Sequence, residues 1–210
     1  MGEGLLMVKL LSNLESDGGS IPTPPLHPKS LILTIDKTGK AQEIIREYHY
    51  LHNAPPALSG PHFLVWFGER ITGAMLWGRP VSRMLPQKTW LELRRFWLVD
   101  DMPTNSESRC LAIAVKCIRK LCPSIEVVLA YSQLSAGHVG TIYKAAGWQF
   151  AWLSSGEGGA SYPTGQRYKT RLNWHQPTGS KKAWIKKLKP DAIINVKIYG
   201  HGTKEPYTPK

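Results

Sequence analysis

The stretch that most constrains the fold is residues 126–152, where two apolar segments flank a polar segment that contains three glycines. Residues 126–130 (EVVLA) predict a strand, and the residues after it predict a helix from about Gly137 to Ala146. Gly147 is expected to end that helix, because glycine readily adopts the left-handed conformation found at helix C-termini. Residues 148–152 (WQFAW) then predict a second strand. In an open α/β sheet, ligands bind where a strand passes into the next helix, so this stretch also locates the candidate site.

The rest of the chain repeats these patterns. Helical spacing predicts helices at 40–51 and 108–121, the second with Asn105 or Ser106 as its N-cap. Apolar runs predict further strands, some of them short, at 30–35, 63–67, 71–78, 90–100, 167–172 and 193–199. The order of strands and helices predicts an α/β domain.

The longest strand candidate carries charge on both of its faces. In residues 90–100, strict alternation places Glu92 and Arg94 on one face and Arg95 on the other. A charge buried in an apolar strand needs an opposite charge or a bound ion beside it. The sequence leaves both explanations open, internal ion pairs or an anionic ligand.

Length and composition favour one domain with less regular ends. Residues 1–29 include a Gly-, Ser- and Pro-rich stretch and predict a flexible segment, followed by a core at 30–153 and a basic extension at 154–210. Three cysteines, an odd number, favour a reducing compartment over a disulfide framework. Because no apolar run reaches the ~18 residues of a membrane span and no targeting pattern is found, we expect a cytoplasmic protein.

Positive charge is concentrated near the C-terminus. The net charge is +12, and residues 166–210 contain eleven Lys or Arg against two acidic residues. Such a field attracts polyphosphates, and the interleaved Tyr168, Trp174 and Trp184 can stack on bases, so this quarter predicts nucleic-acid binding. A basic surface that only aids solubility is the alternative. The lysines expected to contact nucleic acid are Lys181, Lys182, Lys186, Lys187 and Lys189.

The order of elements resembles the GCN5-related N-acetyltransferase superfamily, whose fold is a mixed sheet flanked by helices. In that superfamily a glycine-rich loop before a helix holds the pyrophosphate of the acyl donor coenzyme A. The matching loop here, residues 103–108 (PTNSES), contains no glycine. Glycine lets backbone N–H groups approach a phosphate closely, and Glu107 would repel a phosphate at the helix N-terminus. We therefore expect this fold without the usual coenzyme A signature.

Four segments resemble one branch of that superfamily more closely. They are residues 48–50 (YHY), 92–97 (ELRRFW), 105–108 (NSES) and 137–148 (GHVGTIYKAAGW). Together they are similar to the Mom family of bacteriophage DNA-modification proteins over residues 45–152. The resemblance implies conversion of adenine in duplex DNA to its carbamoylmethyl form at the exocyclic amine, which protects phage DNA from host restriction. Gln133 departs from the pattern, because the family often has an aspartate there and an amide cannot act as a base.

The implied chemistry selects the candidate site residues. An adenine amine is a poor nucleophile inside the base stack, so the base must be everted and met by a proton acceptor and by donors aimed at the acyl oxygen. We expect His49 to accept a proton and Tyr143 to protonate the leaving group. Tyr50 is the third catalytic candidate, although on a continuous helix it would face away from His49. Arg95 can hold a phosphate or carboxylate. The remaining donor- or substrate-binding candidates are Asn105, Ser106, Ser108, Gln133, Gly137, His138 and Gly140.

The missing glycine loop raises the question of the acyl donor. A glycyl group on the adenine amine is an isomer of the carbamoylmethyl product, so glycyl-tRNA is one candidate donor, which would make tRNA a partner beside DNA. Acetyl-CoA with a separate nitrogen source is the rival. A metal, with iron as one option, held by His49, Tyr50 and His138 remains an alternative, although the spacing is not that of a tight site. Two other functions also stay open: a protein or small-molecule N-acetyltransferase that uses acetyl-CoA, and a DNA-binding protein without catalysis.

Overall fold

The computed structural model describes residues 27–55, 59–154 and 181–194, which form seven strands and three α-helices. The helices are α1 (Lys40–Tyr48), α2 (Ser106–Leu121) and α3 (Thr141–Ala145). The strands are β1 (Leu31–Ile35), β2 (Phe63–Phe67), β3 (Arg70–Gly78), β4 (Trp90–Leu98), β5 (Val127–Gln133), β6 (Gln149–Ser154) and β7 (Lys181–Lys187). Short 3-10 helices precede β1 at Pro28–Ser30 and follow β5 at Leu134–Ala136.

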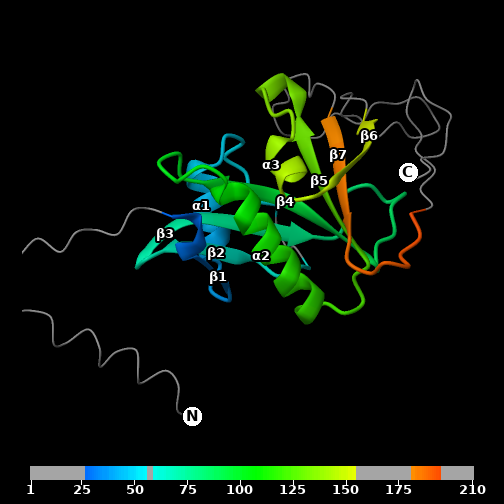
Figure 1. Cartoon of the computed structure of the whole chain (residues 1–210), viewed down its shortest axis with the longest axis horizontal. Helices are drawn as coiled ribbons and strands as arrows, with labels where there is room; N and C mark the ends of the chain where they lie inside the picture. Colours follow the sequence, from blue (N-terminus) through cyan, green and yellow to red (C-terminus); the bar gives the residue numbers. More distant parts are fainter. Residues whose placement is uncertain (1–26, 56–58, 155–180, 195–210) are drawn as a thin grey trace, which may run out of the picture.

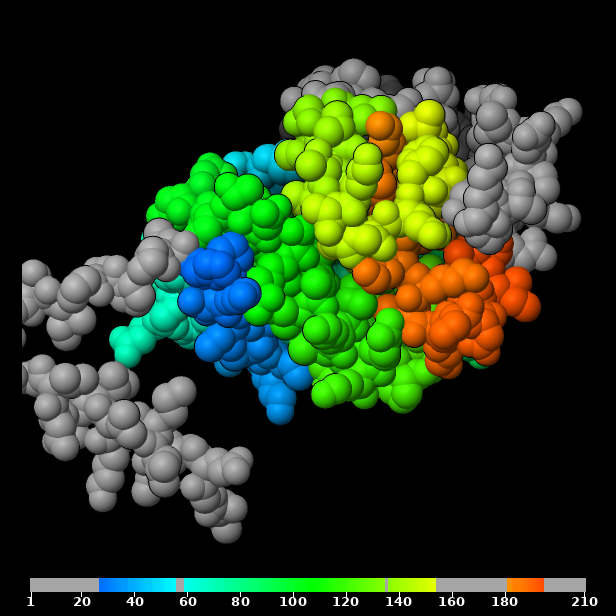
Figure 2. All heavy atoms as spheres, viewed as in Figure 1, coloured from blue at the N-terminus to red at the C-terminus, as the bar shows by residue number. Residues whose placement is uncertain are grey.

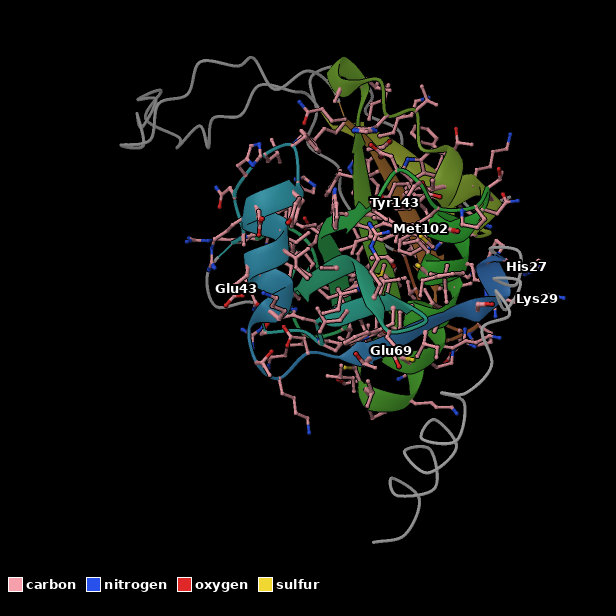
Figure 3. All side chains as sticks on the ribbon, turned by 90° about the vertical axis from the view of Figure 1, so that its left-hand side faces the viewer. His27, Lys29, Glu43, Glu69, Met102 and Tyr143 are labelled. Carbon is pink, nitrogen blue, oxygen red and sulfur yellow. The ribbon has the colours of Figure 1, made fainter. Side chains whose placement is uncertain are left out.

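All seven strands belong to one mixed sheet in the order β1-β2-β3-β4-β5-β7-β6 (Figure 1). Only β4 and β5 run parallel, because α2 crosses the sheet between them. Turning the molecule by 90° shows α1 on one face and α2 and α3 on the other (Figure 3). Figure 2 shows the surface of this second face. The green segment that includes α2 lies between the blue segment that includes β1 and the yellow segment of α3 and β6. The predicted α/β fold with a mixed sheet is confirmed.

The parallel strands β4 and β5 separate towards their carboxyl ends. Trp90–Leu93 of β4 pair with Val127–Ala130 of β5. Beyond these residues β4 continues beside β3 and β5 continues beside β7, so the two described strands no longer bond to each other. The separation lies where β5 leads towards α3, which is where the sequence located the candidate site.

A bulge in β4 decides which charges share a face. The register with β3 shifts between Leu76, which pairs with Arg95, and Trp77, which pairs with Leu93, so Arg94 is the extra residue. Strict alternation, which separates Glu92 from Arg95, is therefore wrong for this strand. Leu93 packs in the core under α2, which places both Glu92 and Arg95 on the opposite face.

Two helices are shorter than the sequence predicts. α1 ends at Tyr48, because His49 adopts an extended conformation with φ −73° and ψ 137°. α3 begins at Thr141, because Gly137 and Gly140 have φ values of 76° and 89°, which an α-helix cannot contain. Gly147, with φ 71°, follows the end of α3 as predicted.

Part of the expected basic extension belongs to the sheet. Residues 181–187 form β7 between β5 and β6, with Ala183, Trp184 and Ile185 buried and two lysines at each end. Most of the expected flexible segment, the strand expected at 167–172 and most of that at 193–199 lie outside the described residues. Within the described ranges, none of the helices combines the length and apolar character of a membrane span.

Candidate functional site

Four of the predicted site residues meet where α1 ends and β5 leads into α3. The rings of His49 and Tyr50 stack with centroids 4.4 Å apart, and the ring of His138 lies 5.5 Å from that of Tyr50. The Tyr50 hydroxyl donates a long hydrogen bond of 3.4 Å to Oε1 of Gln133. Because α1 stops at Tyr48, Tyr50 lies beside His49 instead of on another helical face. Tyr50 is 51% exposed and His49 is buried.

Arg95 lies close to this group on the face of the sheet that α1 covers. Its Nε donates to the carbonyl of Asn53 at 3.0 Å, and its Nη1 donates to the carbonyl of Arg94 at 2.6 Å. Burial lowers the pKa of His49, and the positive charge of Arg95 lowers it further. Burial raises the pKa of Tyr50, and the charge of Arg95 opposes that shift. In the described part of the chain no carboxylate lies within ion-pair distance of Arg95, and Glu92 is the acidic group whose charge acts on it.

Glu92, the buried acidic residue of β4, has partners within the protein. Its carboxylate lies 3.4 Å from Nε of Arg94 and accepts the backbone N–H of Val81 at 2.8 Å. Burial raises the pKa of Glu92, while Arg94, Lys181 and Arg95 oppose that shift. An internal ion pair therefore explains Glu92. The sequence pointed to Glu92 as a charge in an apolar strand, but it could not predict the approach of Lys181, because that depends on the position of β7.

The His49 ring is a neutral donor in this structure. Its Nδ1 accepts the backbone N–H of Leu51 at 3.2 Å, which leaves the ring proton on Nε2. Burial, with the charges of Arg95 and His138, lowers the pKa of His49 from 6.5 to about 4. An imidazole with this tautomer and pKa donates a hydrogen bond from Nε2 more readily than it accepts a proton at neutral pH. The geometry thus favours a donor role for His49 over the acceptor role expected from its ordinary pKa.

Tyr143 approaches the same place from the other face of the sheet. The label of Tyr143 in Figure 3 marks its position among the side chains of the interior. The centroid of its ring lies 5.5 Å from that of Trp148 and 6.0 Å from that of Trp184, and only 8% of the residue is exposed. Burial raises the pKa of Tyr143, and the neighbouring Tyr50 raises it further. The phenol therefore stays protonated at neutral pH and can serve as a proton donor beside the half-exposed Tyr50.

The two glycines of the β5–α3 connection are placed differently. Gly140 is buried against the indole of Trp184, and a Cβ built there would overlap the ring atoms Cε2, Cζ2 and Nε1. Nε1 of that indole donates to Oγ of Ser132 at 2.9 Å. Gly137 is exposed, and a Cβ there would meet nothing within 4 Å. Gly140 thus shapes the wall of the site around Tyr143, whereas Gly137 only turns the chain.

The Mom protein family matches residues 30–201 of this chain. The chain belongs to the Mom protein family. It is 36% identical over 118 residues to the methylcarbamoylase Mom of Escherichia phage Mu. The aligned region covers 52% of this chain and 48% of that protein. The chain thus spans about half the length of this curated relative.

Solved structures similar to this Mom-family chain share its fold at low sequence identity. AAC(6')-Ib in complex with ribostamycin and coenzyme A has a TM-score of 0.52 and 9% identity, covering 75% of this chain and 93% of the other. Arabidopsis thaliana NAA60 in complex with acetyl-CoA has a TM-score of 0.50 and 8% identity, covering 75% and 99%. These likenesses confirm the acetyltransferase-like fold.

Two of the three candidates at the start of α2 use their side chains for hydrogen bonds within their own loop. Ser106 is fully buried and donates its hydroxyl to the carbonyl of Pro103 at 2.6 Å, while Ser108 donates to the carbonyl of Asn105 at 3.0 Å. Asn105 is the N-cap, as predicted, but its side chain caps no helix N–H within the described residues, and its φ is 72°. With Glu107 in the first turn, these groups fit the pyrophosphate of coenzyme A poorly. Among the described residues, neither a hydrogen bond nor a ring contact joins them to the group around Tyr50.

The five candidate lysines are spread over both faces of the sheet. Lys182 and Lys186 share the face of the buried Trp184, and Lys181 and Lys187 point to the other face. Lys186 donates to the carbonyl of Ala146 at the end of α3 at 2.6 Å. Lys189 lies 3.9 Å from Glu126. The structure therefore does not gather these lysines into one patch, and Lys181 is the member near Arg95 and Glu92.

The metal alternative finds little support in the donor set. His49, Tyr50 and His138 are neighbours, but their rings face each other in stacked or tilted arrangements and Gln133 adds a neutral amide. Among the described residues, His, Cys, Asp and Glu side chains form no group of three suited to a metal ion.

Proposed function

We propose that this chain is an enzyme that modifies adenine in double-stranded DNA at the exocyclic amine, giving the carbamoylmethyl base that shields phage DNA from restriction in the host cytoplasm. Membership of the Mom family and the similarity to a methylcarbamoylase support DNA modification. The observation that carries the proposal is the meeting of His49, Tyr50, Gln133 and Tyr143 where β4 and β5 part. These groups match the donors and acceptors that acyl transfer to an amine requires.

The proposed roles follow from what each side chain can donate or accept. Oε1 of Gln133 accepts a hydrogen bond from the adenine amine and orients it, as it now does with Tyr50. Nε2–H of His49 donates to the acyl carbonyl oxygen, where negative charge develops. Tyr143 donates a proton to the leaving oxygen, and Arg95 holds a phosphate of the bound nucleic acid.

For the donor, we propose glycyl-tRNA. The adenine nitrogen forms a bond to the glycyl carbon, the ester bond breaks, and the amine proton ends on the leaving ribose oxygen. The glycyl amine then attacks C6 of the purine, the bond from C6 to the original nitrogen breaks, and one proton passes from the glycyl nitrogen to the original nitrogen. That nitrogen becomes the carboxamide, and no further reactant is needed because the two species are isomers. The poor fit of residues 103–108 to a pyrophosphate supports this donor over acetyl-CoA.

Isotopic labelling tests both parts of the proposal. Cells that produce the protein are grown with glycine carrying heavy nitrogen and carbon, and the nucleosides of their DNA are measured by mass spectrometry. We expect a carbamoylmethyl deoxyadenosine in which both labels appear and the heavy nitrogen is bonded to C6. A modified base without label would exclude glycyl transfer and favour acetyl-CoA, whereas ordinary deoxyadenosine alone would exclude the activity.

Two alternatives predict different results in the same cells. A protein or small-molecule acetyltransferase would bind acetyl-CoA tightly and leave DNA unchanged. A DNA-binding protein without catalysis would bind duplexes equally well with and without Tyr143→Phe and would produce no modified base. Measuring nucleosides and DNA binding for wild type and Tyr143→Phe therefore separates the three functions.

A further inference from the structure

The connection between β3 and β4, residues 79–89, presents apolar side chains to solvent. Met84 is 66% exposed and Val81 is 62% exposed. The same connection has three exposed cations, Arg79, Arg83 and Lys88, and its sequence contains no acidic residue. Large apolar side chains surrounded by cations suit a partner that offers both apolar and anionic surface, which is what stacked bases and phosphates provide.

Neighbouring groups hold this connection in a defined shape. Leu85, next to Met84, is buried in the core with Trp90, so the chain is anchored immediately beside the exposed tip. The Gln87 amide donates to the carbonyls of Ser82 at 2.8 Å and Leu85 at 3.0 Å. The tip therefore does not need to be ordered by a partner, which lowers the entropic cost of binding.

The base of the connection lies next to the candidate site. The Val81 N–H is held by Glu92, which shares a sheet face with Arg95, and Nη1 of Arg94 donates to the carbonyl of Arg79 at 3.4 Å. Arg95 in turn bonds to Asn53, four residues after His49. The start of the connection, at Arg79 and Val81, and Asn53, which follows α1, therefore both contact the stretch of β4 from Glu92 to Arg95.

We propose that residues 79–89 form a DNA wedge, in which Met84 enters the base stack in place of the everted adenine and Arg79 and Arg83 contact the flanking phosphates. The inference rests on the proposed function and adds to it the side chain that keeps the target base out of the duplex. An enzyme that reacts with a base must remove it from the stack, and apolar side chains inserted between base steps unstack them. An exposed, unbranched methionine can fill the irregular space left behind.

Fluorescence of 2-aminopurine tests the wedge without any acyl donor. The analogue replaces the target adenine in a duplex and becomes brighter when it leaves the stack. Wild type is expected to increase the signal several-fold at saturation, and Met84→Ala to lose most of that increase, roughly tenfold less everted base. Ile32→Ala is the matched control, because Ile32 is 57% exposed on β1 and we expect it to behave as wild type.

A second substrate keeps the test specific. When the analogue stands opposite an abasic site it has no pairing partner to lose, so Met84→Ala is expected to recover a signal close to that of wild type. Arg83→Ala should instead weaken binding to all duplexes and reduce the slope of log affinity against log salt by about 1. Equal brightening by Met84→Ala and wild type on the paired duplex would overturn the wedge.

The outcome also separates this inference from the proposed function. If wild type modifies adenine in cells and Met84→Ala does so at the same rate, the wedge is wrong and the activity stands. If wild type neither brightens the duplex nor modifies adenine, both are wrong. A loss of signal in Met84→Ala that is matched by Ile32→Ala would also overturn the wedge, because it would reflect general damage.

Discussion

Substituting alanine at Gly140 tests how the wall of the site is built. The left-handed conformation at φ 89° costs an alanine ~1–2 kcal/mol, and forcing a methyl group against Trp184 adds ~1–3 kcal/mol. The free energy of unfolding should therefore fall by about 2–5 kcal/mol, which lowers the melting temperature of a domain this size by roughly 4–20 °C. We expect the rate of DNA modification to fall as well, because the displaced indole of Trp184 stacks on the ring of Tyr143. Thermal unfolding followed by circular dichroism measures the stability.

Gly137→Ala is the matched control for this prediction. Its φ of 76° imposes a similar backbone cost of ~1–2 kcal/mol, but its added methyl group enters open space. The difference between the two variants therefore isolates the contact with Trp184. If both variants lose the same stability, the close approach of Gly140 to the indole does not constrain the fold and the reasoning is refuted.

Four further predictions concern His49, Tyr143 and Lys186. Because the pKa of His49 falls from 6.5 to about 4 on folding, the unfolded chain binds a proton that the folded chain does not between these values. Stability should thus decrease by up to about 3 kcal/mol as the pH falls through that window, and urea unfolding should show a shallower decrease in His49→Asn. His49→Gln, which places an N–H near the position of Nε2, should retain more modification than His49→Asn, and equal losses would contradict the donor role. Tyr143→Phe should reduce modification by about 100-fold or more with DNA binding unchanged, so a smaller kinetic effect would exclude proton donation. Lys186→Met removes the bond to the Ala146 carbonyl and should cost about 1–2 kcal/mol in unfolding experiments, whereas no loss would show that water replaces it.

The sequence predicts most of the sheet, because its strands are apolar runs separated by turn residues. The bulge at Arg94 was not predictable, because it depends on the register with β3 and leaves no periodic signal within β4 itself. β7 was missed for a related reason. Its three apolar residues lie between paired lysines, and their burial is evident only once β5 and β6 are known to lie on either side.

The roles of the candidate site residues stay predictions, but the structure shows which of these residues are neighbours. His49, Tyr50, Gln133 and His138 were singled out by motif, and the fold brings them together. What the sequence could not predict is the bond from the Leu51 N–H to Nδ1 of His49, which depends on α1 ending at Tyr48 and His49 being extended. That single backbone contact decides the tautomer and so favours a donor over a base.

The position of β7 has a consequence for how the protein is made. β6 lies at the margin of the sheet next to β7, yet it is synthesised before β7. On the ribosome, the outer side of β5 and the whole of β6 must wait for residues 181–187 to emerge before their hydrogen-bonding groups are satisfied. Unpaired strands of this kind associate with other nascent chains, so a pause in translation before residues 181–187 emerge should trap the protein in aggregates.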